Sequence, residues 1–496
     1  MMGHQPQVQE KLFYTRVNLN QRIPKNHILR KMTTIVDFDF VYKEVKDKYG
    51  YNGNISVPPP VILKLMLLLI LYNVRSEREL MSTLPFRLDW LWFLDYDLDD
   101  EIPNHSVLSK ARTRWGVDTF QCFFERIVIQ CVQAGLVDGS KLFMDSSNIQ
   151  ADASNNSVVN THDIKRYLKK SYQLLEDRLE KENNQSDDDH IDPPKTGSAN
   201  SKYLSTTDPD ASVQRQGGSR SKLKYKVHRG VDGKHEIITA TSVTTGSVNE
   251  AHLLKPLLLE HEKTTGLKAQ TCVADSKYGI IENYLACHDL GLKGHFASFE
   301  KAHRGSGSQK DIFPKENFVY NADTDSFICP KGKELKRRRF SKQRRQWEYT
   351  ASLSVCRNCS SFSHQCTRSK TGRSLKRHER QEDLNKMQLQ AESKESVKDI
   401  RTRQSLMERS FARSTRYGFK RARWRRLWRV KIQEYLTAAI QNVMVLVQHV
   451  KEPDATQAAA NRKPEKSNRT GQFIHQFLAL FTNKSISKNL LHVPAG

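Results

Sequence analysis

The stretch Lys141–Gln150, KLFMDSSNIQ, decides how the rest of the chain is interpreted. Its apolar residues lead to Asp145, and the turn residues Asp138 and Gly139 precede it. A short apolar run after a turn is typical of a buried strand. A carboxylate that ends such a strand needs a partner, a proton or a metal ion to offset the cost of burial. The residues of this stretch leave two interpretations: Asp145 caps the following turn, or it belongs to a functional site.

The composition favours a globular protein with a polyanionic partner. The chain has 496 residues, of which 37% are hydrophobic and 27% charged, so it is long enough for several domains. Its net charge is +25 and its pI about 9.6. Such an excess favours nucleic acid, because neutralising phosphates with counterion release dominates binding to DNA.

We expect a cytoplasmic location and no membrane partner. The most apolar stretch, Val61–Val74, contains Lys64 and is shorter than the about 20 residues needed to span a bilayer. It predicts a core helix instead. The start of the chain lacks the apolar region of a signal peptide, and eight cysteines in so long a chain do not make a disulfide scaffold.

The periodicity of apolar residues predicts five segments. Residues 1–136 are expected to form a helical N-terminal domain that binds DNA, with one helix starting near Ser106 and another over Thr119–Ala134. Residues 137–299 would begin an α/β domain, 300–398 a basic insertion with four cysteines, and 399–450 the closing helices of the α/β domain. Residues 451–496 are expected to be a linker and a tail.

Within the α/β domain, strands and helices alternate. Leu223–Arg229 and Glu236–Thr244 flank the turn Asp232-Gly233, which predicts a β-hairpin. Ala269–Asp275 and Leu292–Phe299 are further predicted strands. Asp163–Asn184 predicts a charged helix, and 185–218 a loop. The order predicts an α/β sheet with helical cover.

Three carboxylates of this domain are candidates for one site. Asp145 and Asp275 each end a predicted strand, and ligands gather at the carboxyl ends of strands in open α/β sheets. Glu408 lies on a predicted helix beside the apolar pair Met407 and Phe411. Carboxylate oxygens suit Mg²⁺ or Mn²⁺, and two such ions can activate water for phosphodiester displacement. Acid–base catalysis by paired carboxylates without metal would leave the positive charge unexplained.

These motifs resemble those of bacterial insertion-sequence DDE transposases. Met144–Ser154 resembles the first-aspartate motif, Val273–Gly279 the second, and Met407–Phe411 with Tyr417–Arg421 the glutamate region. Pro103–Ser109 and the helices before it resemble the N-terminal domain of the family. The resemblance covers roughly residues 35–450.

The resemblance implies an RNase H-like catalytic core that cleaves DNA and transfers strands at the ends of an insertion sequence. Asp145, Asp275 and Glu408 would be the catalytic ligands of Mg²⁺ or Mn²⁺. The partners would be double-stranded DNA with terminal inverted repeats and a second copy of the chain, in a homodimeric synaptic complex. The location would be the bacterial cytoplasm, associated with the nucleoid. Asp152 is a second candidate ligand in the first motif.

The chain departs from the family around Glu408. Arg401, Gln404 and Thr415 stand where many relatives have tyrosine, arginine and lysine. Neighbouring basic residues are candidates for the phosphate-contacting roles, namely Arg401, Arg403, Arg413, Arg416, Lys420 and Arg421. Two alternatives therefore accompany the transposase interpretation: a catalytically inactive, domesticated DNA-binding protein, and a stand-alone RNase H-like nuclease.

The insertion carries two further candidate sites. Cys329, Cys356, Cys359 and Cys366 include a Cys-x-x-Cys pair, which fits a structural zinc site as well as four free thiols. His364 could replace one of these ligands. The basic run Lys336–Arg345, with its aromatic Phe340, is expected to contact phosphate, and a solvated loop is the alternative.

Overall fold

The computed structural model describes residues 18–50, 55–160, 199–215, 218, 220–298 and 312–449. The charged helix expected at 163–184 and the tail at 451–496 lie outside the described residues, as do 185–198, 216 and 217 of the expected loop. The expectation of a loop is wrong for its described part, because α10 (Ala199–Lys202), β3 (Tyr203–Ser205) and β4 (Ser212–Gln214) form there.

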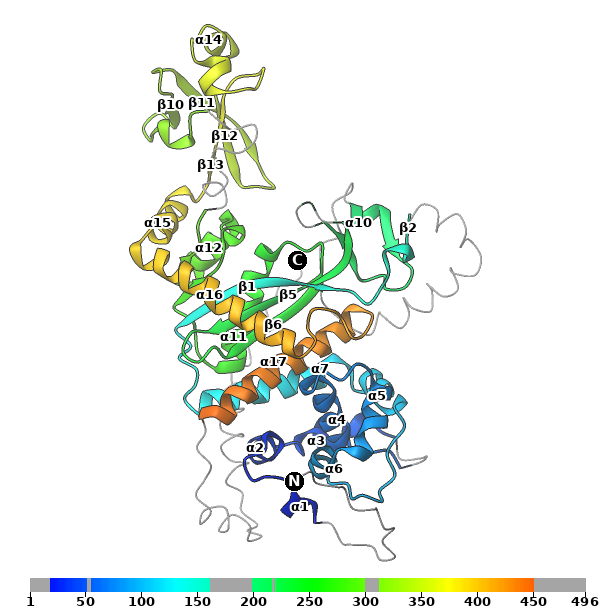
Figure 1. The fold of residues 1–496 in the computed structure, drawn as a ribbon. Coiled ribbons are helices and arrows are strands. Elements are labelled where there is room, and N and C mark those ends of the chain that lie inside the picture. The colour runs from blue at the N-terminus through cyan, green and yellow to red at the C-terminus, as the bar shows by residue number, and fades with distance from the viewer. Residues whose placement is uncertain are drawn as a thin grey trace, which may run out of the picture. The chain divides into compact units, whose positions relative to one another are not determined.

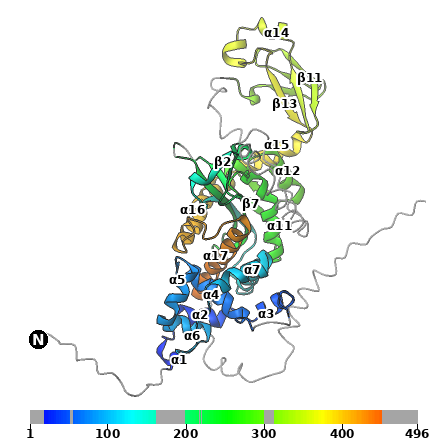
Figure 2. The ribbon, with the colours of Figure 1, turned by 90° about the vertical axis from the view of Figure 1, so that its right-hand side faces the viewer.

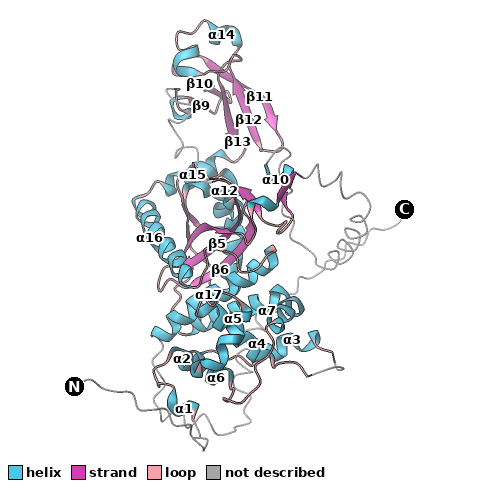
Figure 3. Ribbon diagram, turned by 45° about the vertical axis from the view of Figure 1, so that its right-hand side comes forward, coloured by secondary structure: helices cyan, strands magenta, loops and turns pink. Residues whose placement is uncertain are grey.

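The described residues before the first strand form helices (Figures 1 and 3). They are α1 (Leu19–Arg22), α2 (Ile28–Ile35), α3 (Phe40–Val45), η1 (Lys46–Lys48), α4 (Pro59–Leu71), α5 (Glu77–Thr83), η2 (Leu84–Phe86), α6 (Leu88–Leu94) and α7 (Ser106–Gln133). The core helix predicted over Val61–Val74 is confirmed as α4, whose buried Lys64 pairs with Asp95 at 2.8 Å. None of the described helices is long and apolar enough to cross a membrane.

Helix α7 contains a break that separates the two helices predicted for this region. Gly116 has φ 72° and ψ −175°, which is outside the helical range. Glycine adopts positive φ without the steric cost that a Cβ atom imposes. The predicted helices from Ser106 and over Thr119–Ala134 therefore lie on either side of Gly116.

A six-stranded sheet follows. It contains β1 (Lys141–Gln150), β4 (Ser212–Gln214), β5 (Lys222–Asp232), β6 (Ile238–Thr245), β7 (Thr271–Val273) and β8 (Lys293–His295). Strand β5 pairs antiparallel with β4, β6 and β1, whereas β1 pairs parallel with β7 and β7 parallel with β8. The predicted hairpin is thus confirmed as β5–β6. Strand β1, which carries Asp145, is the neighbour of β7, and Asp275 follows β7 as the cap of the turn after it.

The expectation that Asp145 ends its strand is wrong. Strand β1 continues to Gln150, because β5 pairs with it from Leu142 as far as Gln150. The polar residues Ser146, Ser147 and Asn148 therefore belong to the strand. Asp145 stands in the middle of β1, opposite Arg229 of β5.

Helices cover both faces of this sheet. Figure 2 shows β7 between α16 (Lys394–Arg416) and α11 (Leu254–Thr265). Alternate residues of β1 point to opposite faces, so Met144 packs in one cluster with Leu254, whereas Phe143 packs in another with Met407. The α11 side also holds α12 (Ile281–Leu290) and α15 (Gln381–Ala391), and the α16 side holds α17 (Leu427–His449).

The insertion contains a sheet of its own. Its five strands are β9 (Val319–Asn321), β10 (Ser326–Ile328), β11 (Glu334–Ser341), β12 (Gln346–Thr350) and β13 (Ser374–His378), and η7 (Lys315–Asn317), α14 (Leu353–Arg357) and η8 (Phe362–Cys366) accompany them. The helices that follow begin at Gln381 and not at Asp399 as expected, because Leu384 and Met387 of α15 pack into the core beside α12.

Short elements complete the described chain. They are η3 (Asn155–Ser157), β2 (Val158–Asn160), α10 (Ala199–Lys202), β3 (Tyr203–Ser205), η4 (Glu250–Leu253) and η5 (Ser276–Tyr278). Two of them, η4 and η5, follow β6 and β7 directly and carry side chains of the candidate site.

Candidate active site

Asp145 lies under helix α16 and has one cationic partner. Arg403 of α16 donates its Nη1 proton to Oδ2 of Asp145 at 2.6 Å, and the Ser146 amide donates to Oδ1 at 2.7 Å. The aspartate side chain is 26% exposed. Burial raises the pKa of Asp145, Arg403 and the Ser146 amide oppose the rise, and Asp275 and Glu250 add to it. Arg403 therefore offsets the negative charge of the Asp145 carboxylate only in part.

Asp275 follows β7, the parallel neighbour of β1, and caps the turn η5. Its Oδ1 accepts the Lys277 amide proton at 3.0 Å. Burial raises the pKa of Asp275, and the carboxylate of Glu250 raises it further, against the opposing charges of Arg403 and Lys277. Asp275 in turn lies close enough to Asp145 to add to the rise of the Asp145 pKa.

Glu250, at the start of η4, is a third carboxylate of this site that the sequence did not reveal. It is buried, and Lys277 Nζ contacts its Oε1 at 2.6 Å and Lys226 Nζ its Oε2 at 3.8 Å. The Ser146 hydroxyl donates to Oε2 as well. Burial alone would raise the pKa of Glu250, but the contacts with Lys277, Ser146 and Lys226 hold it below the ordinary value. The local signal, a helix-capping Asn249 directly before it, predicts the start of a helix but no site residue.

Glu408 lies on the outer face of α16. It is exposed, and its Oε1 accepts a hydrogen bond from Gln404 of the same helix at 3.2 Å. Arg403 precedes it by five residues, which corresponds to about 140° around a helix. Since Arg403 faces Asp145, Glu408 points away from the two aspartates. The structure therefore brings Asp145 and Asp275 together and leaves Glu408 apart from them.

The site offers two of the oxygen ligands that a divalent ion needs. Within the described residues, no three His, Cys, Asp or Glu side chains are placed to hold a metal ion together. The chemistry of Asp145 and Asp275 nevertheless fits: burial and neighbouring carboxylates raise both pKa values, and a bound cation would favour the ionised forms. Hard carboxylate oxygens are the ligands that Mg²⁺ and Mn²⁺ prefer.

The six basic residues predicted to contact DNA differ in their surroundings. Arg403 contacts Asp145, Arg413 pairs with Glu236 at 2.5 Å, and Arg421 pairs with Asp152 at 2.8 Å. The remaining members, Arg401, Arg416 and Lys420, are exposed.

Asp152, the second candidate in the first motif, lies beyond the end of β1. Its carboxylate is engaged by Arg421 and by Arg425, whose Nε lies 3.4 Å from Oδ2. The structure therefore places Asp152 in an arginine cluster apart from Asp145.

Two family models match the chain. The one described as Transposase domain (DUF772) matches residues 17–114, and the one described as Transposase DDE domain matches residues 193–443. The second match contains Asp275, Glu250, Arg403 and Glu408, whereas Asp145 lies between the two matched segments. No curated protein and no solved structure matches the chain.

Proposed function

Because this chain belongs to the transposase DDE domain family, we propose that it cleaves DNA at the ends of an insertion sequence and joins them to new DNA. The observation that carries the proposal is the aspartate pair. Asp145 and Asp275 come from neighbouring parallel strands, and burial raises the pKa of both carboxyls. A fold that leaves two adjacent carboxylates unbalanced gains stability when a cation binds between them.

The sheet supports an RNase H-like assignment of the catalytic core. Starting from β6, the strands follow the spatial order β6-β5-β1-β7-β8, with the first three antiparallel and the last three parallel. The first aspartate stands on the central strand and the second follows its parallel neighbour. In this arrangement one carboxylate from each strand reaches the same site.

In the proposed mechanism Asp145 and Asp275 would hold a divalent metal ion. Glu408, which the sequence motif assigns as the third ligand, would have to move towards them, because it points away from the two aspartates in this structure. The metal, when bound, lowers the pKa of water and stabilises the oxygen that leaves phosphorus. Asp145 would have to release Arg403 from Oδ2, and the guanidinium would then be free to contact a DNA phosphate. Lys277 and Lys226 hold Glu250 ionised beside the aspartates.

The proposed partners follow from charge and from the reaction. A net charge of +25 favours a long polyanion such as duplex DNA. Strand transfer requires two element ends in one complex, so a homodimer on paired terminal inverted repeats is proposed.

The experiment compares Asp145→Asn and Asp275→Asn with the control Asp152→Asn. With Mg²⁺ and DNA that carries the element ends, each of the first two variants is expected to lose cleavage by about 10³-fold or more, because a metal ion contributes several kcal/mol to such a reaction. DNA binding should remain, and the control should cleave normally. Full cleavage by Asp145→Asn would overturn the site assignment.

Two further readouts separate the alternatives. Joined products in the cleavage reaction support a transposase, whereas cleavage without joining identifies a stand-alone nuclease. If the unchanged protein binds the ends and never cleaves them, the domesticated DNA-binding protein is the correct interpretation.

A further inference from the structure

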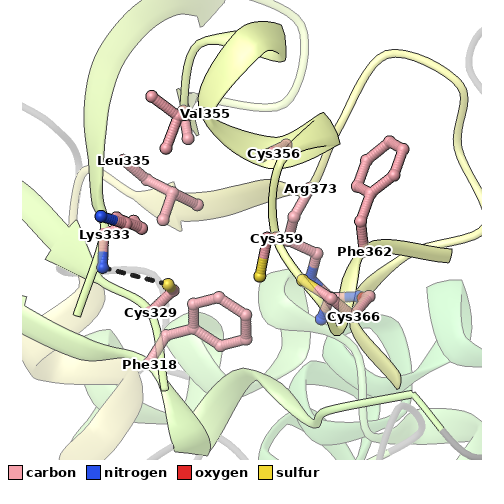
Figure 4. A pocket seen from close by; sticks show the side chains of 11 residues that line it. Phe318, Cys329, Lys333, Leu335, Val355, Cys356, Cys359, Phe362, Cys366 and Arg373 are labelled. Atoms are coloured by element: carbon pink, nitrogen blue, oxygen red, sulfur yellow. Dashed lines mark hydrogen bonds between the residues drawn. The ribbon is translucent and has the colours of Figure 1, made fainter. Parts of the chain in front are cut away.

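The four cysteines of the insertion surround a single small cavity. They come from three places in the chain: Cys329 follows β10, Cys356 and Cys359 lie in and after α14, and Cys366 ends η8. All four line a cavity of about 30 Å³ together with Phe318, Leu335 and Phe362. Figure 4 shows the sulfur atoms of Cys329, Cys359 and Cys366 around this space. The cavity has room for about one water molecule or one ion.

The backbone around Cys329 forms a tight turn that holds its sulfur atom in place. The Cys329 amide donates to the Lys333 carbonyl at 2.8 Å, and the Lys333 amide donates to the Cys329 sulfur at 3.2 Å. Gly332 within the turn has φ 70°, which a residue with a Cβ atom rarely adopts. The turn therefore fixes Cys329 at the wall of the cavity.

The four thiols are available to a ligand. All four are free and half-buried. They line one small cavity, whose other walls include Phe318, Leu335 and Phe362. Four free thiols around a space of this size can coordinate a single cation.

The insertion has few other sources of stability. The buried core of its sheet consists of six residues: Phe318, Phe327, Leu335, Tyr349, Ala351 and Leu375. Small modules with a core of this size are commonly held together by a structural metal or by disulfides. The described cysteines form no disulfide. A structural metal ion is therefore the cross-link that could stabilise the insertion.

We propose that Cys329, Cys356, Cys359 and Cys366 bind one structural Zn²⁺ as a tetrahedral four-thiolate site. Zinc takes four such ligands at about 2.3 Å. Within the described residues no three of these thiols already stand in coordinating positions, so binding turns the sulfur atoms inward around the cavity. The side chain of His364 is exposed and does not line the cavity, which favours four cysteines over three cysteines and a histidine. The ion ties the β10–β11 turn to α14 and η8.

The test measures zinc in the full-length protein after dialysis against metal-free buffer. Elemental analysis should find about one zinc per chain, and Cys356→Ser and Cys366→Ser should each lose most of it. Cys122→Ser is the matched control: this cysteine is also partly exposed but belongs to α7, so its zinc content should equal that of the unchanged chain.

A second measurement does not depend on the variants folding. Co²⁺ exchanged into the unchanged protein should give the intense thiolate-to-cobalt absorption of a four-sulfur site. A chain that contains no zinc, whose four thiols react at once with a thiol reagent in the native state, would overturn the proposal. Finding two disulfides in their place, or full zinc content in Cys356→Ser, would overturn it equally.

Discussion

Asp145 and Arg229 face each other across β1 and β5, yet the fold treats their two charges in opposite ways. Arg229 is fully buried, and its Nε and Nη2 donate hydrogen bonds to the carboxylate of Glu434 of α17, at 2.6 and 2.8 Å. Its remaining Nη1 protons reach Ser410 and Ser414 of α16. The protein itself therefore supplies a hydrogen-bond partner for each nitrogen of the Arg229 guanidinium.

Asp145, by contrast, remains partly exposed and has Arg403 as its one cationic contact in the described structure. Two other carboxylates, Asp275 and Glu250, raise its pKa further. The balanced charge of Arg229 holds helices on the sheet, whereas the unbalanced charge of Asp145 is available to a ligand from outside.

Arg229→Met should destabilise the protein by about 3–5 kcal/mol, because the variant leaves Glu434 buried without its counter-charge. Urea unfolding with the fluorescence of the tryptophans measures the effect. The double variant Arg229→Met with Glu434→Leu removes both charges and should lose markedly less. If the single variant unfolds at the same urea concentration as the unchanged protein, this ion pair does not hold the scaffold.

Glu408→Gln and Glu250→Gln should separate a metal ligand from a charge that serves the fold. Glu408 is exposed, so its replacement should leave stability unchanged. If Glu408 turns towards the aspartates as the third metal ligand, the same variant should reduce Mg²⁺-dependent cleavage at least ~100-fold. Glu250→Gln should lower the free energy of unfolding at pH 7 by on the order of 1 kcal/mol, because the folded state holds the pKa of Glu250 low.

The stability that Glu250 contributes is present above its unfolded pKa and is lost as the pH falls through its lower folded pKa. The difference between Glu250→Gln and the unchanged chain should therefore vanish in acid. If Glu250→Gln abolishes cleavage without affecting stability while Glu408→Gln cleaves normally, the third ligand is Glu250.

Asp275→Asn should stabilise the metal-free protein at pH 7 by on the order of 1 kcal/mol. Its folded pKa is raised, mainly by burial, so the acid form stabilises the fold below the unfolded pKa and this stability is lost as the pH rises through the folded pKa. Asparagine keeps the neutral form and can still accept the Lys277 amide proton that caps η5. Thermal unfolding in a chelating buffer should show the gain at pH 7 and none near pH 3. A loss of stability at pH 7 would mean that the carboxylate is balanced after all.

Arg403→Met should tighten binding of Mn²⁺ to the DNA-free protein several-fold. The arginine occupies Oδ2 of Asp145, and its positive charge repels an incoming cation. Titration calorimetry measures the affinity. Arg409→Met, which removes a cation of the same helix that pairs with Glu236 at 2.5 Å, serves as the control. Equal affinities in all three proteins would show that Arg403 does not compete with the metal.

The sequence predicted the strands next to Asp145 and Asp275 better than it predicted the residues that these aspartates contact. Apolar runs and the Asp232-Gly233 turn identified the hairpin and the neighbouring strands, because these signals are local. The polar run after Asp145 resembled a loop, and only pairing with β5, about eighty residues further along the chain, makes it a strand.

The third carboxylate was beyond local signals. Periodicity identified the buried stripe of α16 through Met407, but it could not show that Arg403, on the same inner face, would meet Asp145. Glu250 was overlooked because its partners Ser146, Lys226 and Lys277 come from three separate strands or turns.

The buried Arg229–Glu434 pair can form only late in the synthesis of the chain. Glu434 emerges from the ribosome two hundred residues after Arg229, and until then the arginine would be buried without a counter-charge at a cost of several kcal/mol. The face of the sheet that holds Asp145 therefore cannot close on an incomplete chain. A truncated product that ends before α17 should therefore be open to protease at β5.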